Sequence, residues 1–230
     1  MHLKVVDPVD PAPLLSVQLD GWSVAKRQIL GSIDIMMQSS ETLALIGPSG
    51  IGKTSLLRII SGLETDYRGQ VKAPPTIAMV FQEPTLLPWR TLAQNITITT
   101  GLSDLQAQNA LAEVGLSGRD GDFPNQLSLG EQRRMALARA FAIKPDLLLL
   151  DEPFVSLDPP LVQEMMRLFA ILRARHSVAT IFVTHVEAEA KQLASRIIEL
   201  RGTPAQIVAD RQNKGAYFQL SASGVTSSGS

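Results

Sequence analysis

Gly-Pro-Ser-Gly-Ile-Gly-Lys-Thr, residues 47–54, is the stretch that decides the fold of this 230-residue chain. It follows the apolar run 43–46 and precedes 55–60, Ser-Leu-Leu-Arg-Ile-Ile, which together give a strand, a glycine-rich turn and a helix. Glycines here let backbone N–H groups turn inward around phosphate oxygens, and the helix N-terminus adds partial positive charge. The stretch therefore predicts a loop that binds the phosphates of a nucleoside triphosphate such as ATP.

The individual residues of this loop have distinct expected roles. Lys53 is expected to reach the β- and γ-phosphates, and the Thr54 hydroxyl is expected to hold Mg²⁺. The expected nucleotide-binding positions of the loop are Gly47, Pro48, Ser49, Gly50, Ile51, Gly52, Lys53, Thr54 and Ser55. A chance glycine-rich turn is the competing interpretation, and the flanking strand and helix argue against it.

Composition limits the classes of protein that this chain can belong to. Apolar residues make up 45% and charged residues 19%, which suits one large α/β domain, expected over 1–220 with a flexible tail at 221–230. The net charge is −1 without a basic run, so no nucleic-acid partner is expected. Cysteine is absent, which excludes disulfides. No run approaches the roughly 20 apolar residues of a membrane span, and the start lacks a signal-peptide pattern, so a cytoplasmic protein is expected.

Apolar periodicity predicts an α/β fold with a mainly parallel sheet and an N-terminal antiparallel β part, and the loop at 47–54 makes its core that of a P-loop NTPase. The expected antiparallel strands are 14–19 and 29–37, with a closing hairpin of 196–200 and 205–209. The expected parallel strands are 43–46, 77–81, 147–150 and 180–184, and the expected core helices are 52–61, 161–175 and 186–194. Strand signals stop between about 91 and 145, where helices are expected at 103–115 and 128–143. This segment predicts a helical subdomain inserted into the α/β core.

Polar residues that follow three of the expected strands are candidates for the catalytic site. Asp151 and Glu152 follow the leucine run 147–150, where Asp151 can hold Mg²⁺ and Glu152 can act as general base on the attacking water. His185 and Gln82 end two other strands; His185 can contact the γ-phosphate or the water, and Gln82 can reach Mg²⁺ or the water. For the acidic pair a solvated strand end, and for His185 a structural histidine, are the competing interpretations.

These motifs occur in an order that resembles the ATP-binding subunit of an ATP-binding cassette (ABC) transporter. The order is 47–54, Gln82, Leu-Ser-Leu-Gly-Glu-Gln at 127–132, Asp151-Glu152, Ser-Leu-Asp at 156–158, and His185. The resemblance covers roughly residues 14–210. The stretch 81–91, Phe-Gln-Glu-Pro-Thr-Leu-Leu-Pro-Trp-Arg-Thr, is similar to importer ATPases of the nitrate/sulfonate/taurine and thiamine-precursor types.

The resemblance implies an ATPase with named partners and further site residues. Two such subunits would pack head to tail as a homodimer, with Ser128, Gly130 and Glu131 of each contacting the nucleotide held by the other. Asp158 would communicate between the two sites, and Lys53, Gln82, Glu152 and His185 would be the catalytic residues. Transmembrane permease subunits would contact the helical insert, a solute-binding protein would deliver the solute, and the chain would lie on the inner face of the cell membrane.

Two positions depart from the family pattern. The family's Leu-Ser-Gly-Gly-Gln has Leu129 at its first glycine and Glu131 at its glutamine. The aromatic residue that stacks on adenine is expected some 25 to 30 residues before the loop lysine, and Trp22, the nearest aromatic, lies slightly farther upstream. Trp22 is therefore either the adenine contact or a partly buried residue at a strand end.

Two other functions compete with the transporter interpretation. A non-transport cassette ATPase in cell-envelope remodelling would share every motif, whereas DNA-repair members carry long coiled-coil inserts and translation members two cassettes, neither of which is present here. A small-molecule kinase would use the same loop but would leave residues 127–132 and Asp158 without a role.

Overall fold

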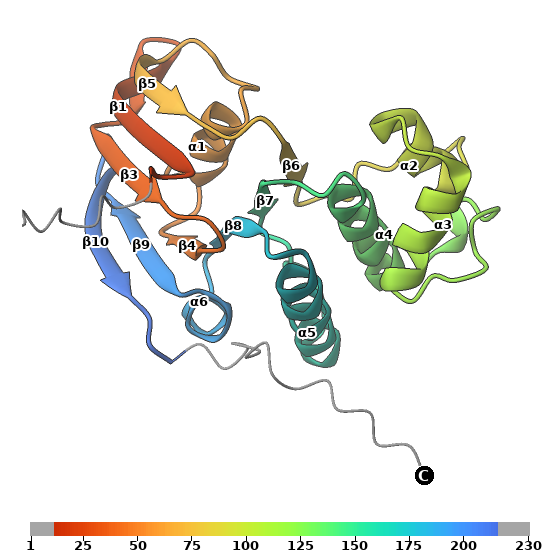
Figure 1. The fold of residues 1–230 in the computed structure, drawn as a ribbon. Coiled ribbons are helices and arrows are strands. Elements are labelled where there is room, and N and C mark those ends of the chain that lie inside the picture. Colours follow the sequence, from red (N-terminus) through yellow and green to blue (C-terminus); the bar gives the residue numbers. More distant parts are fainter. Residues whose placement is uncertain (1–11, 216–230) are drawn as a thin grey trace, which may run out of the picture.

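The computed structural model describes residues 12–215, which form two sheets, helices packed against them and a group of helices to one side (Figure 1). The strands are β1 (Leu15–Val24), β2 (Arg27–Leu30), β3 (Ile33–Met37), β4 (Thr42–Ile46), β5 (Arg68–Lys72), β6 (Ile77–Val80), β7 (Leu147–Asp151), β8 (Ala179–Thr184), β9 (Arg196–Arg201) and β10 (Gln206–Gln212). The helices are α1 (Lys53–Ile60), α2 (Leu92–Thr100), α3 (Asp104–Glu113), the 3₁₀ turn η1 (Pro124–Gln126), α4 (Leu129–Ala142), α5 (Pro159–His176) and α6 (Glu187–Leu193). The expected tail, 221–230, lies outside the described residues.

The central sheet has the strand order β10-β9-β4-β8-β7-β6, in which only the β9–β10 pair is antiparallel. The leucine run of β7 explains why both of its faces are covered. Leu148 and Leu150 pack into the core formed with α4 and α5, whereas Leu147 and Leu149 pack into the core formed with α1, β1 and β3. A parallel strand that is apolar on both faces requires such double coverage, as the sequence predicts.

The antiparallel sheet is built around β1, which pairs with β3 and β5 along its first half and with β2 at its end. The expected single strand 29–37 is wrong, because the chain breaks at Gly31 into β2 and β3. At the break, the Gly31 N–H donates to the Ala205 carbonyl (2.8 Å) and the Ala205 N–H donates to the Ile29 carbonyl (2.8 Å). These long-range hydrogen bonds to the segment before β10 outweigh the local strand pattern. No short window of sequence reveals such bonds.

The segment between β6 and β7 contains helices and no strand, as expected, and Figure 1 shows α2, α3 and α4 gathered on one side of the molecule. The helix α4 contacts α2 and α3 and also packs against β6 and α5, so it joins the insert to the core. Capping boxes at Ser103 and Ser128 begin α3 and α4. The sequence pattern missed α2, whose Ile-Thr-Ile-Thr-Thr end is rich in β-branched residues with low helix propensity.

The other expected elements agree with the structure within a few residues at each end. The helix α1 ends before Gly62, which adopts the left-handed conformation (φ +74°) expected of a C-terminal cap. The predicted closing hairpin is β9 and β10, and β5 was not predicted. Within residues 12–215, no helix is both long and apolar enough to cross a membrane.

Candidate nucleotide site

The glycine-rich loop encloses the ammonium group of Lys53. Lys53 is 4% exposed, and its Nζ donates to the carbonyl oxygens of Gly47 (2.8 Å) and Pro48 (2.9 Å). Burial lowers the pKa of Lys53, while the nearby carboxylates of Glu152 and Asp151 raise it. The sequence places this lysine at the first residue of α1, so a charged donor stands next to the free N–H groups of a helix start.

Thr54 and Asp151 form a pair of oxygen ligands beside this lysine. The Thr54 hydroxyl donates to Asp151 Oδ1 at 3.0 Å, which joins the start of α1 to the end of β7. Asp151 is 5% exposed, and burial raises its pKa, while the Thr54 hydrogen bond lowers it. Neighbouring ligands of an octahedral Mg²⁺, at about 2.1 Å each, lie about 3.0 Å apart. The donor set and its spacing therefore fit the expected magnesium ion.

Glu152 lies at the centre of the site in a strained backbone conformation. Its φ of +46° falls in the left-handed region, which costs a non-glycine residue about 1–3 kcal/mol and is concentrated at functional sites. Its N–H donates to the Val183 carbonyl at 3.1 Å, which fixes the turn to the end of β8. His185 follows β8, and its Nδ1 lies 3.8 Å from Glu152 Oε1. The two predicted catalytic residues therefore lie together, as parallel strand ends require.

One cavity of about 630 Å³ collects half of the predicted residues. Its lining includes Glu152 and Gln82, the strand residues Trp22, Val24 and Ile29, and part of the loop and α1. The loop and α1 residues that line it are Ser49, Gly50, Gly52, Lys53, Thr54 and Ser55. A volume of this size suits a nucleotide-sized ligand. His185 lines a neighbouring cavity of about 200 Å³, and Glu152 lines both.

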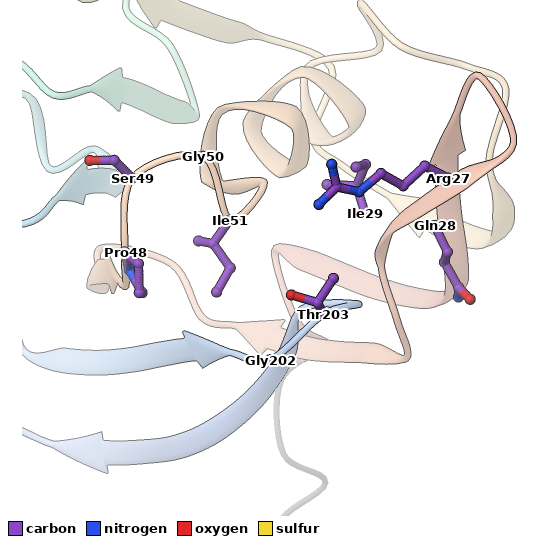
Figure 2. A pocket seen from close by; sticks show the side chains of 9 residues that line it. All are labelled: Arg27, Gln28, Ile29, Pro48, Ser49, Gly50, Ile51, Gly202 and Thr203. Atoms are coloured by element: carbon purple, nitrogen blue, oxygen red, sulfur yellow. The ribbon is translucent and has the colours of Figure 1, made fainter.

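A second cavity, of about 410 Å³, lies against the loop next to the β9–β10 turn (Figure 2). The Arg27 side chain extends toward the loop, whereas the Gln28 side chain points away from it. Pro48, Ile51 and Thr203 belong to this cavity and not to the one that contains Lys53. Pro48 and Ile51 therefore lie on the side of the loop that faces the β9–β10 turn.

Comparisons with known proteins agree with this geometry. The family model described as ABC transporter matches residues 30–155. The chain belongs to the ABC transporter family.

Among the relatives of this ABC chain are import ATP-binding proteins and a dimeric cassette. The aliphatic sulfonates import ATP-binding protein SsuB 3 of Paraburkholderia xenovorans is 44% identical over 85% of this chain and 80% of its own. SsuB 2 of Rhizobium johnstonii is 46% identical over 76% of this chain and 72% of its own. The dimeric ATP-binding cassette MJ0796, solved in a post-hydrolysis state with ADP and phosphate, aligns at a TM-score of 0.75 and 25% identity over 87% of this chain and 99% of its own. This ABC chain is therefore an ATPase of the type that powers import.

Four residues that the resemblance assigned to nucleotide binding lie away from the Lys53 cavity. Ser128, Gly130 and Glu131 begin α4, and Asp158 precedes α5; none of them lines that cavity. Asp158 is exposed, and its side chain makes no capping hydrogen bond. Within one ABC chain these residues do not complete the site, so their expected role requires a second copy.

A capping box holds the start of α4, although its sequence departs from the family motif. Glu131 accepts a hydrogen bond from the Ser128 N–H (2.8 Å), and Ser128 Oγ accepts one from the Glu131 N–H (3.3 Å). The Ser128 N–H and the Ser128 hydroxyl both donate to the Glu131 carboxylate, and these two bonds, together with Arg119, lower the pKa of Glu131. Leu129 is 44% exposed, so its side chain adds apolar surface at the helix end. A Cβ at Gly130 would lie 3.0 Å from the terminal side-chain carbons of Leu161, so a larger residue here would require that side chain to shift.

Sequence reasoning missed several residues in or beside the site. Val24 lines the Lys53 cavity two residues after Trp22 on β1, a spacing that could have indicated a shared face. Glu189 of α6 lines, with His185, the smaller cavity that Glu152 also lines, and its carboxylate accepts from the Thr184 hydroxyl at 2.5 Å. Another is the buried Arg133 of α4, for which the sequence gave no signal because its partners are backbone carbonyls of distant loops.

Proposed function

We propose that this chain hydrolyses Mg²⁺-ATP at the Lys53–Glu152 cavity and thereby powers a multi-subunit importer of a small organic anion. The observation that carries the proposal is the convergence of Lys53, the Thr54–Asp151 pair and Glu152 at one edge of the parallel sheet. Those groups supply a phosphate-binding cation, a metal-binding oxygen pair and a base. Ligands bind at this edge in open α/β sheets.

The proposed reaction divides the work among the chain's own residues. Water attacks the γ-phosphorus; the new O–P bond forms as the bond to the β-phosphate oxygen breaks, so ADP leaves and Glu152 accepts the proton. Lys53 and the loop N–H groups stabilise charge on the phosphate oxygens. His185, 3.8 Å from Glu152, orients that carboxylate or the water. Thr54, Asp151 and Gln82 would hold Mg²⁺, which supplies charge neutralisation when it is bound.

We propose that two copies of the chain form a dimer, because Ser128, Gly130 and Glu131 need a second copy to contact nucleotide. The α4 start is a donor-rich, positive helix end that would contact the γ-phosphate held by the partner. The cassette MJ0796 is dimeric in its post-hydrolysis structure. Asp158, exposed before α5, would lie at the dimer interface and link the two sites. We place one ATPase domain at 1–220 with its helical subdomain at about 91–145.

The relatives' names extend the proposal to transport partners and substrate. The matched import proteins are named for aliphatic sulfonates, so we propose a sulfonate-like anion as the transported solute. Permease subunits would contact the helical insert, a solute-binding protein would supply the solute, and the chain would sit on the inner face of the cell membrane through its permease. The cell-envelope remodelling switch is not favoured by these relatives.

The first test measures phosphate release from ATP by the full chain with and without Mg²⁺. We expect Mg²⁺-dependent release of ADP and free phosphate, and Lys53→Ala is expected to lose ATP binding itself. A phosphorylated small-molecule product, or equal turnover by Lys53→Ala, would contradict the proposal.

The second test identifies partners. The Glu152→Gln variant would be incubated with detergent-solubilised native membranes and Mg²⁺-ATP and then purified. The proteins that copurify with it would be identified by mass spectrometry. A stoichiometric multi-span permease supports the importer, and a neighbouring solute-binding protein allows sulfonate binding to be measured directly. A homodimer without any membrane partner would favour the remodelling switch instead.

A further inference from the structure

Arg133, on the first turns of α4, is buried without a carboxylate partner. It is 6% exposed and lies among apolar side chains such as Val80, Leu137 and Phe154. Among the described residues no acidic group lies within ion-pair distance of it, and its Nε has no hydrogen-bond partner. Burial lowers its pKa, and the charge of Glu83 offsets this only in part. A buried cation without an ion pair is costly to keep, so its remaining contacts are informative.

Those contacts are two backbone carbonyls from loops that carry proposed catalytic residues. Arg133 Nη1 donates to the carbonyl of Gln82, which follows β6, and Nη2 donates to the carbonyl of Val155 at 3.2 Å. The planar guanidinium presents its donors in a fixed fork, so one side chain sets the spacing between the two loops.

The Val155 contact closes the turn that begins at Glu152. The Val155 N–H donates to the Glu152 carbonyl at 3.3 Å, and Arg133 binds the other side of the same peptide segment. Both Glu152 (φ +46°) and Ser156 (φ +61°) adopt left-handed backbone conformations. Strained residues of this kind persist only where surrounding contacts hold them. Arg133 supplies one of those contacts from outside the turn.

The Gln82 contact belongs to a wider attachment of the loop after β6 to the helical insert. Arg139, two turns farther along α4, donates to the carbonyls of Pro84 (3.1 Å) and Thr85 (3.0 Å). Arg133 differs from Arg139 because only Arg133 also reaches the Glu152 turn. Figure 1 shows α4 at the junction between the insert and the sheet, where such a link has to lie.

We propose that Arg133 is a positioning residue that sets the distance between Gln82 and Glu152 and ties both to the α4 start at Ser128. Through it, displacement of α4 moves both catalytic loops together. This inference rests on the proposed ATP hydrolysis, in which Gln82 and Glu152 act at one site. Because Arg133 contacts the backbone of Gln82 and Val155 and does not line the Lys53 cavity, it affects the rate of hydrolysis and not the binding of ATP.

The test separates binding from turnover in matched variants of the full chain. Arg133→Met keeps the side-chain length in an apolar environment and removes every donor. We expect its Kd for Mg²⁺-ATP to stay within about twofold and its kcat to fall at least about tenfold. Arg133→Lys keeps a cationic donor and is expected to recover part of that loss. The control Arg134→Met removes the neighbouring arginine, whose contacts are Val114 and Glu164 and not the catalytic loops; its kcat is expected to match the unaltered chain.

A double-mutant cycle with Gln82→Ala tests the route of the effect. If Arg133 acts through the position of Gln82, the combined variant loses less than the product of the two single losses. Full multiplication of the two losses, unaltered kcat in Arg133→Met, or an equal loss in Arg134→Met would each overturn the inference. Failure of the proposed function is recognised separately, because then the unaltered chain itself releases no phosphate or Glu152→Gln turns over normally.

Discussion

Glu152 shows at the scale of one residue how strain and chemistry coincide. The run of leucines in β7 fixes where the strand ends, and the left-handed φ of Glu152 then turns its carboxylate into the cavity shared with Lys53. This backbone conformation costs about 1–3 kcal/mol, which an ordinary strand end would avoid. Single substitutions at and around this position therefore test the site most directly.

Replacement of Glu152 by Gln is expected to lower kcat at least about 100-fold while ATP affinity is retained, because only the proton acceptor is lost. Single-turnover phosphate release and equilibrium nucleotide binding measure the two effects. Glu187→Gln, an exposed position on α6, serves as the control with normal turnover. Turnover above about a tenth of normal would remove Glu152 from the role of base.

Replacement of Trp22 by Ala is expected to weaken ATP binding about tenfold, since stacking of a base on an aromatic ring is worth about 1–3 kcal/mol. Trp22 lines the Lys53 cavity, whereas the chain's other tryptophan, Trp89, is 68% exposed and does not. Trp89→Ala is therefore the matched control in a titration with ATP. Equal affinities of both variants would assign Trp22 to packing alone.

Replacement of Glu189 by Gln is expected to change the pH dependence of stability. Burial raises the pKa of Glu189 above its ordinary 4.5, so the folded chain holds this proton more tightly than the unfolded chain. Its ionisation therefore opposes folding as pH rises above that value, and Glu189→Gln removes the penalty. The Tm of the variant relative to the unaltered chain should rise from pH 4 to pH 8.

The control variant is Glu187→Gln, for which the relative Tm is expected to change with pH in the opposite direction. The Lys191 hydrogen bond lowers the pKa of Glu187, so ionised Glu187 favours folding as pH rises. The relative Tm of Glu187→Gln should stay level or fall over the same range. A relative Tm for Glu189→Gln that falls with pH would contradict the assignment.

At the scale of elements, the helical insert organises a segment that has no regular structure of its own. Residues 81–91 connect β6 to α2, and their backbone groups bind side chains of α2 and α4. Asn95 of α2, which is fully buried, accepts from the Leu87 N–H (2.7 Å) and donates to the carbonyls of Leu87 (3.1 Å) and Arg90 (3.1 Å). The insert therefore determines the path of this connection.

Replacement of Asn95 by Ala is expected to lower the free energy of unfolding by about 2–4 kcal/mol, because buried backbone groups lose their partners. Urea denaturation followed by circular dichroism measures the change. Asn109→Ala, at an exposed position of α3, is expected to stay within about 0.5 kcal/mol of the unaltered chain. A neutral Asn95→Ala would show that the connection holds its path without this side chain.

At the scale of the whole molecule, the α4 start and the Lys53 cavity are separate parts of one chain. The α4 start with Ser128 does not line the cavity of Lys53, and Leu129 exposes apolar surface beside it. A pair of chains that place this helix end on each other's nucleotide would use both features. Hydrolysis would then remove the γ-phosphate contact that holds the pair together.

Glu152→Gln chain with Mg²⁺-ATP is therefore expected to elute and scatter light as a dimer, and to return to a monomer when ATP is removed. The double variant Lys53→Ala with Glu152→Gln, which lacks the phosphate-binding cation, should remain a monomer under the same conditions. A monomeric Glu152→Gln protein at saturating ATP would contradict the paired arrangement.

The sequence by itself determined the elements whose pattern is local. Residues 43–60 specify a strand, a phosphate-binding loop and a helix through apolar spacing and glycine positions, and the leucine run 147–150 with Asp151 and Glu152 specifies a second strand end. Because parallel strand ends meet at one edge, the grouping of Lys53 with Glu152 follows from that pattern too.

Only the tertiary structure decided features that depend on bonds between distant segments. The break at Gly31 follows from its hydrogen bond to Ala205, and the role inferred for Arg133 follows from carbonyls of Gln82 and Val155, 51 and 22 residues away. Backbone carbonyls carry no signature in the sequence, since every residue has one. A side chain that binds them is recognised only when the fold has brought the loops together.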